Sequence, residues 1–421
     1  MEKRFEEINR LIKFFPGERG RELWIGTLVQ DFIEIYNNLF EELPGYVRYT
    51  FLEKFGEFVE KELREIRTLR SAYGREFEKI RETQKIPEFF DIRKKLAQIT
   101  GKLFDKSHSV MELHELCTQY NDHLTLQIIY LVEEELRHKE KVWPRGRYAW
   151  IRMGSAGREE QTLFVDQDNL VVYEHPKDKE YFQIFSKRVV KSLESVGIDL
   201  CHGDVMASNI RWRGTLEEWK VRLREMAFRE EELVSGIILL DAKYAAGDPG
   251  LASQFIEEVQ KMPKMNLGLL REIAQIATEM PLALTVFRGF QLESHGKHKG
   301  QFNAKLQGWM PLVMTVLIYA LKYHVRETNT VKRIRALERL GHFDAKFSSD
   351  LQEAYFTLTR HKVLKQIDAI RNRRKKPDYY LKPKEFGEKE EKKIWDSLIT
   401  ILQLRQIARR SFDLTKKIPG L

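Results

Sequence analysis

Cysteine and long apolar segments are both scarce in this sequence. Only two cysteines occur, Cys117 and Cys201, and neither a disulfide framework nor a zinc site of the CxxC type can be built from them. The longest apolar run, about 310–321, contains Pro311 and is shorter than the roughly 20 residues that cross a membrane. The charged N-terminus lacks the apolar segment of a signal peptide. We therefore expect a cytoplasmic protein with no membrane partner.

Neither sign of charge dominates the chain. Its 421 residues include 72 Lys and Arg against 63 Asp and Glu, a formal net charge of +9. This modest excess suits an anionic ligand such as a nucleotide and does not require nucleic acid. Basic patches interleaved with aromatic residues are lacking as well, so we do not expect a nucleic-acid partner. Hydrophobic residues make up 42% of the chain, enough for a buried core in two or three domains.

Hydrophobic periodicity divides the chain into three parts. Apolar residues recur at helical spacing in residues 1–140 and again in 214–421, whereas 141–213 combines short apolar runs with one helical segment. We therefore predict an α+β fold, mostly helical, in which an α/β core is flanked by helical N-terminal and C-terminal regions.

The predicted core has a simple order of elements. Two strands are expected at 148–153 and 163–173, a helix at 179–195 and a third strand at 197–207. Thr215 has the position of a helix N-cap, and the last helix of the chain is expected at about 388–412.

A Gly-Ser turn followed by two carboxylates is the most informative motif. Gly154 and Ser155 follow the first predicted strand, where backbone N–H groups of a turn can approach phosphate oxygens closely. Asp166 and Asp168 stand two residues apart on the second predicted strand, so both point to one face while Gln167 points to the other. The pattern predicts a site for a nucleoside triphosphate and its divalent metal ions.

Other phosphate and metal motifs fail at particular residues. A calcium loop needs a third oxygen ligand two residues on and then Gly, but Leu170 and Val171 occupy those positions. A P-loop needs Gly-Lys-Ser or Gly-Lys-Thr at the start of a helix, and the chain has neither.

The motif resembles that of a known family. The string Gly-Ser-x-Gly-Arg-x-Glu-Gln-Thr-Leu-x-x-Asp-Gln-Asp-Asn, at 154–169, is similar to the signature of polymerase-β-like nucleotidyltransferases. It looks like the branch called domain-of-unknown-function family 294, which is related to the N-terminal part of bacterial PII-protein uridylyltransferase. The resemblance continues through later blocks over about 75–415. It implies a short mixed sheet with helices in the core and a substrate-binding domain in the C-terminal helices.

The resemblance also implies roles for individual residues. Asp166 and Asp168 would be catalytic and would hold Mg²⁺, with Mn²⁺ as an alternative. Asp204 is the candidate for a third catalytic carboxylate, and Asp199 is its rival. The remaining candidates would bind the nucleotide: Gly154, Ser155, Arg158, Lys305 and Arg333. Each has a structural alternative: a solvated loop for the Gly-Ser turn, a solvated or salt-bridged surface position for Arg158, and a surface or capping role for Lys305 and Arg333.

Several polar residues carry weaker signals. Asp241 and Asp248 are expected to be structural, the latter as a turn and helix cap at Gly247-Asp248-Pro249. Asn329 is a candidate for lining the nucleotide site or for capping a helix. His295 and His298 fit a basic loop better than a metal site. The basic run 371–376 reads as a solvated loop, with an acidic partner or RNA as alternatives.

Three functions remain open from the sequence. The first is transfer of a nucleoside monophosphate from a nucleoside triphosphate to a hydroxyl, with a protein as acceptor, as in the uridylyltransferase. The second is a signalling module that binds a Mg–nucleotide without turnover. The third is an RNA-tailing transferase, which the modest basicity disfavours.

Overall fold

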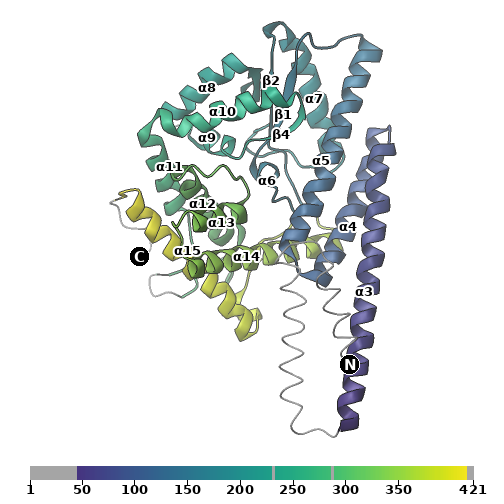
Figure 1. Ribbon diagram of the computed structural model, residues 1–421, viewed down its shortest axis with the longest axis vertical. Coiled ribbons are helices and arrows are strands. Elements are labelled where there is room, and N and C mark those ends of the chain that lie inside the picture. Colours follow the sequence, from purple (N-terminus) through teal and green to yellow (C-terminus); the bar gives the residue numbers. More distant parts are fainter. Residues whose placement is uncertain (1–44, 230–232, 286–288, 415–421) are drawn as a thin grey trace.

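The computed structural model describes residues 45–229, 233–285 and 289–414, so the first 44 residues of the predicted helical N-terminal region lie outside it. Helices predominate, and a small mixed sheet lies at one end of the molecule (Figure 1). The expected α+β, mostly helical fold is confirmed. The described chain begins with α3 (Gly45–Glu82), α4 (Phe89–Ser107) and α5 (Val110–Glu135), which continues as the π-helical turn η2 (Leu136–Glu140).

The sheet has the strand order β3-β2-β1-β4. Its strands are β1 (Tyr148–Arg152), β2 (Asn169–Tyr173), β3 (Arg213–Thr215) and β4 (Lys243–Gly247). The central strand β1 is antiparallel to both β2 and β4, whereas β2 and β3 are parallel. Helix α6 (Gly154–Gly157) follows β1 directly, so the Gly-Ser turn is held at the end of a buried strand.

Two strand predictions were wrong. Residues 197–207 form no strand; they contribute one isolated bridge, Asp166↔Asp199, before a turn in which Asp204 has a φ of 54°. The outer strands are instead β3, which has only three residues, and β4, which lies in a region predicted to be helical. The sequence of β4, Lys-Tyr-Ala-Ala-Gly, has no β-branched residue, so pairing with β1 rather than intrinsic preference makes it a strand.

Helices cover both faces of the sheet. Phe182 and Phe185 of α7 (Lys179–Ser195) pack on Tyr148 of β1, with ring centroids 5.4 Å apart in each pair. Helix α10 (Pro249–Met265) contacts β1, β2 and β4, and Figure 1 shows it across the sheet from α7. Between them in sequence lies α8 (Leu216–Phe228), whose Trp219 donates its indole N–H to the carbonyl oxygen of Val171 at 3.2 Å.

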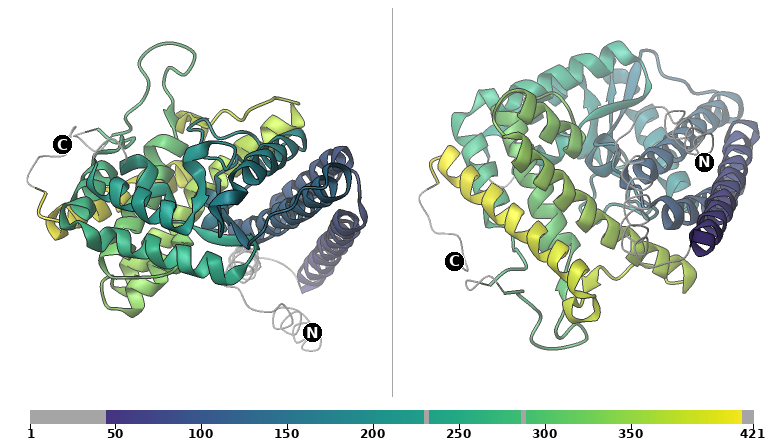
Figure 2. Two further views of the ribbon diagram at one scale, coloured as in Figure 1. Left: turned by 90° about the horizontal axis from the view of Figure 1, so that it is seen from above. Right: turned by 60° about the horizontal axis from the view of Figure 1, so that its bottom comes forward.

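The rest of the chain is an assembly of helices beneath the sheet in Figure 1. Its elements are α9 (Leu233–Leu239), α11 (Leu267–Glu279), the π-helical η6 (Lys305–Trp309), α12 (Met310–Lys322), α13 (Thr330–Arg339), α14 (Ala345–Arg371) and α15 (Glu388–Ser411), with a two-residue ladder of β5 (Phe302–Asn303) and β6 (Tyr380–Leu381). Helix α14 contacts both α15 and α5, so it joins the C-terminal and N-terminal parts. Between α11 and η6 the segment 289–301 projects from the body (Figure 2).

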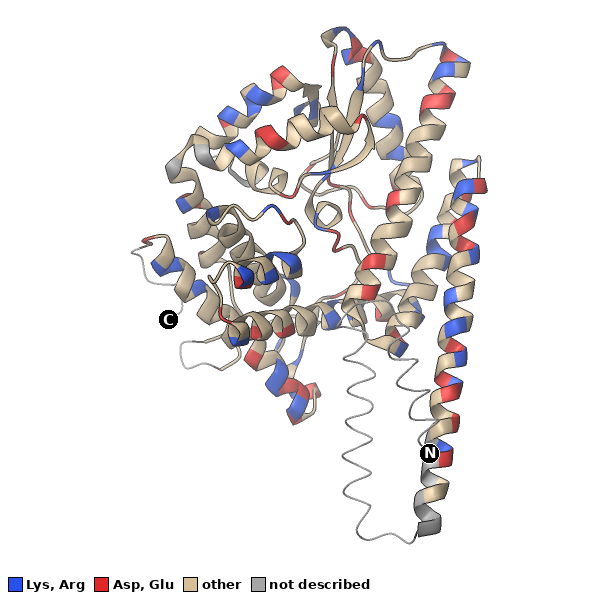
Figure 3. Cartoon of the chain, in the orientation of Figure 1, with Lys and Arg blue, Asp and Glu red and all other residues tan. Residues whose placement is uncertain are grey.

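Local sequence signals explain several helix ends. Thr215 and Glu218 form a capping box at the start of α8, and Asp248 caps α10 by accepting from the N–H of Leu251 at 2.7 Å, as predicted. Lys and Arg alternate with Asp and Glu along α3 (Figure 3), where pairs such as Arg64–Glu60 support the helix. Among the described helices, none combines the length and the apolar character needed to cross a membrane.

Candidate active site

The glycines of the motif are required by close packing. Gly154 has a φ of +55°, and a Cβ built on it would lie 2.2 Å from the Oδ2 atom of Asp168. A Cβ on Gly157 would lie 1.9 Å from the carbonyl oxygen of Asp241. The turn therefore packs its backbone directly against the second carboxylate, and only glycine leaves room for that approach.

Both carboxylates precede β2, which begins at Asn169, so the prediction that they lie on a strand from 163 was wrong, although Gln167 still points away from them. Asp166 is exposed and Asp168 is partly buried. Burial and the neighbouring charge of Asp166 raise the pKa of Asp168 to about 6, against a bond from the Cys201 thiol that lowers it. The side chain of Gln167 points into the core, where its amide donates to the carbonyl oxygens of Val190 and Ile198, both at 3.1 Å. The two acids are therefore close enough for the charge of Asp166 to affect the pKa of Asp168.

Asp199, rather than Asp204, pairs with Asp166 through backbone hydrogen bonds. Asp199 is the parallel bridge partner of Asp166: its N–H donates to Val165, and its carbonyl accepts from Gln167 at 2.8 Å. Side chains of bridge partners leave a ladder on the same side. Asp204 lies in an exposed turn, and its carboxylate accepts from the amide of Asn209 at 2.7 Å. The structure therefore brings Asp199 to Asp166 and gives Asp204 a local turn partner.

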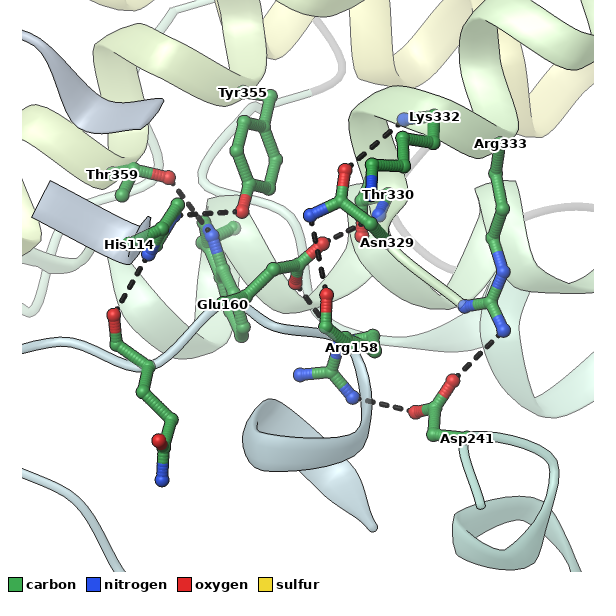
Figure 4. Close-up of polar contacts among 12 residues, drawn as sticks. His114, Arg158, Glu160, Asp241, Asn329, Thr330, Lys332, Arg333, Tyr355 and Thr359 are labelled. Carbon is green, nitrogen blue, oxygen red and sulfur yellow. Dashed lines mark hydrogen bonds and ion pairs between the residues drawn. The ribbon is translucent and has the colours of Figure 1, made fainter. Parts of the chain in front are cut away.

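Arg158 and Arg333 are both bound to Asp241 (Figure 4). The guanidinium of Arg158 donates to Glu160 at 2.9 Å and to Asp241 at 2.6 Å, while that of Arg333 donates to Asp241 at 2.9 Å. Burial lowers the pKa of Arg158, but Asp241 and Glu160 outweigh it and hold that pKa above its ordinary value. Arg333 is only 2% exposed. In this arrangement both arginines link the motif to α13.

Glu160 joins the motif to the C-terminal helices. It is fully buried, and its carboxylate accepts from Arg158 and from the N–H of Thr330 at the start of α13. Asn329 caps that helix and donates its amide to the carbonyl oxygen of Arg158 at 3.2 Å (Figure 4). Asn329 therefore combines a capping role with a contact to the motif.

His114 of α5 extends the same network. One ring nitrogen lies 2.9 Å from the carbonyl oxygen of Gln161, and the other lies 3.0 Å from the hydroxyl of Tyr355 on α14 (Figure 4). Burial lowers the pKa of His114 to about 4, so the ring is neutral at pH 7. Elements from all three parts of the chain thus hold the loop 158–163.

Two protein-family models match this chain. Residues 94–232 match the family described as "Putative nucleotidyltransferase DUF294", and residues 268–412 match its companion, the "Putative nucleotidyltransferase substrate binding domain". Together the two matches span more than half of the chain. The chain belongs to this nucleotidyltransferase family. No curated protein matches it.

In this nucleotidyltransferase, the region matched as the substrate-binding domain contains two lysines near the motif loop, and the sequence analysis selected only one of them. Lys362 of α14 is 6% exposed, and its Nζ lies 4.2 Å from the ring centroid of Trp309. Lys305, a sequence candidate, begins η6, and its Nζ lies 5.4 Å from the ring centroid of Tyr379. No sequence motif marks Lys362, because one lysine in a 27-residue helix has no local signature.

The polar loops fit no further metal site. Across the described ranges, no three or more His, Cys, Asp or Glu side chains converge on one metal position. His298 stacks on Tyr380 with centroids 3.7 Å apart, and His295 lies 2.7 Å from the hydroxyl of Ser294. The basic run 371–376 is exposed; its last residue, Lys376, lies 3.3 Å from His202.

Proposed function

We propose that this protein transfers a nucleoside monophosphate from a nucleoside triphosphate to a hydroxyl group of an acceptor. The observation that carries the proposal is the packing of the Gly154 backbone against the Asp168 carboxylate, beside Asp166. If the turn binds phosphate and the acids bind metal ions, this arrangement would hold the two ligands in contact with each other. The family match to nucleotidyltransferases supports the same reaction class.

The carboxylate pair suits Mg²⁺, with Mn²⁺ as an alternative. Two adjacent carboxylates are hard oxygen ligands. Burial, and after it the charge of Asp166, raise the pKa of Asp168 to about 6, and a divalent cation would offset both effects. Such ions would neutralise charge on the phosphates during transfer. Asp199 is our choice for the third carboxylate, because it is the bridge partner of Asp166.

The reaction needs one bond formed and one broken. The acceptor oxygen bonds to the α-phosphorus, the bond from that phosphorus to the bridging oxygen breaks, and pyrophosphate leaves. The hydroxyl proton passes to a site carboxylate or to water. Ser155 and the first backbone N–H groups of α6, which have no acceptor within the helix, would face the β- and γ-phosphates. Arg158 and Arg333 would act through Asp241, by holding the C-terminal helices against the motif.

We infer a protein as the acceptor and the cytoplasm as the place of reaction. The acceptor follows from the resemblance of residues 154–169 to the uridylyltransferase relatives, and residues 268–412, matched as a substrate-binding domain, would hold it. Both cysteines, Cys117 and Cys201, are free, which suits a reducing compartment.

Incubation with each α-labelled nucleoside triphosphate, Mg²⁺ and cell extract tests the function. We expect a labelled protein band with one nucleotide, and loss of that band with Asp166→Asn or Asp168→Asn. Asp204→Asn is the matched control, because Asp204 bonds only within its turn. The proposal fails if no labelled product forms or if Asp166→Asn labels as well as the parent. Label in RNA instead of protein would identify a tailing enzyme.

A second candidate is a Mg–nucleotide-binding module without turnover. The observation that favours it is that, within the described parts of the chain, no group of three metal-ligating side chains converges. Calorimetry with each nucleotide, followed by recovery of the nucleotide after hours, separates the two: binding with intact nucleotide supports the module.

A further inference from the structure

Lys362 is a buried lysine that has no acidic partner among the described residues. Its side chain lies in α14, is nine-tenths buried, and makes no salt bridge with any described residue. Its Nζ lies over the ring of Trp309, and the guanidinium of Arg158 lies 5.8 Å from the centroid of the same ring. A buried ammonium group costs several kcal/mol, on the order of 2 or more, unless an anion or hydrogen bonds compensate it.

The charged groups around Lys362 do not supply that compensation. Burial, then Lys305 and Arg158, lower the pKa of Lys362 to about 7, while Glu160 and Asp166 act in the opposite direction. Glu160 is engaged by Arg158 and by the N–H of Thr330. Arg158 is neutralised by its own two acids. Lys362 and Lys305 are therefore the basic residues of this cluster that form no salt bridge with any described residue.

The lysines belong to the same site as the carboxylate pair. Gln366, one helical turn after Lys362 on the same face of α14, accepts from the N–H of Leu163 at 3.1 Å and donates to Thr162 at 3.0 Å. Gln366 also donates to the hydroxyl of Tyr379, the ring beneath Lys305. The negative charge of Asp166 acts to raise the pKa of Lys362 and the pKa of Tyr379, so Asp166 is near both side chains. This face of α14 is thus held against the motif loop.

We propose that Lys362, together with Lys305, binds the terminal phosphates of the nucleoside triphosphate. The proposal rests on the proposed function for the identity of the nucleotide, but the chemistry asks only for a compact polyanion. A triphosphate that spans from the Gly154–Ser155 turn to α14 would give the buried ammonium its missing partner. The nucleotide would then contact both matched regions, and the C-terminal helices would complete the binding site.

The proposal is tested by measuring the binding of phosphate ligands that have a nucleobase and of one that has none. The probes are inorganic tripolyphosphate, an α,β-methylene nucleoside triphosphate and the corresponding nucleoside monophosphate, each titrated by calorimetry with Mg²⁺. We expect Lys362→Met to weaken the binding of tripolyphosphate and of the nucleoside triphosphate analogue by the same factor, at least about tenfold. The monophosphate lacks the terminal phosphates, so its affinity should not change. Lys346→Met on the exposed surface of α14 is the control.

Folding is checked in the same series. Methionine fills a similar volume without a buried charge, so the melting temperature of Lys362→Met should equal or exceed that of the parent. If this variant does not fold, Lys305→Met at the partly exposed neighbouring site decides by the same tenfold criterion. Tripolyphosphate binding unchanged in the deciding variant overturns the proposal, even if nucleotide transfer is found. If transfer is absent but Lys362→Met still weakens tripolyphosphate binding, only the proposed function fails.

Discussion

Gly154 and Asp168 are in such close contact that a single methyl group cannot be placed between them. The Cα of Gly154 carries no side chain, its φ is +55°, and an added Cβ would lie 2.2 Å from the carboxylate oxygen of Asp168. In the proposed reaction Gly154 would contribute its backbone N–H and Asp168 a metal-binding oxygen. Their contact would then define where a phosphate and a cation meet in this molecule.

Substitution of Gly154 by alanine should therefore disrupt both the site and the fold. Left-handed backbone costs an alanine about 1–2 kcal/mol, and displacement of Asp168 adds to it. We expect the free energy of unfolding in urea to fall by about 2 kcal/mol or more, with loss of nucleotide transfer. Gly74→Ala in the interior of α3 is the control. This change should not lower the free energy of unfolding, because open space surrounds Gly74 and alanine favours a helix. A Gly154→Ala variant as stable and active as the parent would contradict the geometry.

Asp241 is expected to be the most sensitive acid of the network between the two matched regions. Asp241→Ala leaves Arg158 without one acid and Arg333 without its salt bridge, both in buried surroundings. Removal of one partner of such buried pairs costs about 3–5 kcal/mol. Urea unfolding monitored by circular dichroism measures the change. Asp350→Ala, which removes a surface pair with Lys346, should change stability by less than about 1 kcal/mol.

The third carboxylate can be assigned by a matched pair of variants. Asp199→Asn should lower the rate of nucleotide transfer by about 10²-fold or more, because Asp199 is beside Asp166. Asp204→Asn should leave the rate within a few-fold, because its carboxylate bonds to Asn209 in a turn. Single-turnover assays at saturating Mg²⁺ compare the two. The reverse order of effects would restore Asp204 to the role that the sequence suggested.

Lys362 should make stability depend on pH above 7. Its pKa in the folded chain is lowered to about 7 from an ordinary value of 10.5, so between these values the unfolded chain binds the extra proton. Rising pH therefore relieves the cost of burying this charge. The melting temperature of Lys362→Met should exceed that of the parent most below pH 7, and the gap should shrink toward pH 10. Thermal unfolding of both proteins across pH 6–10 measures it; a constant gap would contradict a lowered pKa of Lys362 in the folded chain.

Much of the local structure was predictable because its causes are local. The helix at 179–195 and the strand at 148–153 follow from hydrophobic spacing, and α7 and β1 occupy those positions. The caps at Thr215 and Asp248 follow from side chains that bond to backbone a few residues away. The strands β3 and β4 could not be found in this way, because their stability comes from hydrogen bonds to residues distant in sequence.

The carboxylate pair and its resemblance to nucleotidyltransferases could be recognised from the sequence, because the Gly-Ser turn and the Asp-x-Asp spacing lie within fifteen residues. The groups that surround the pair depend on how the chain folds. Asp199 lies at a bridge that the sequence pattern did not distinguish from the turn at Asp204, and Arg333 is bound to Asp241 across more than 90 residues. Lys362 meets the motif loop across about 200 residues, through the helix that Gln366 anchors. Burial and counter-charge are properties of neighbours in space, and chain-distant neighbours leave no local pattern to read.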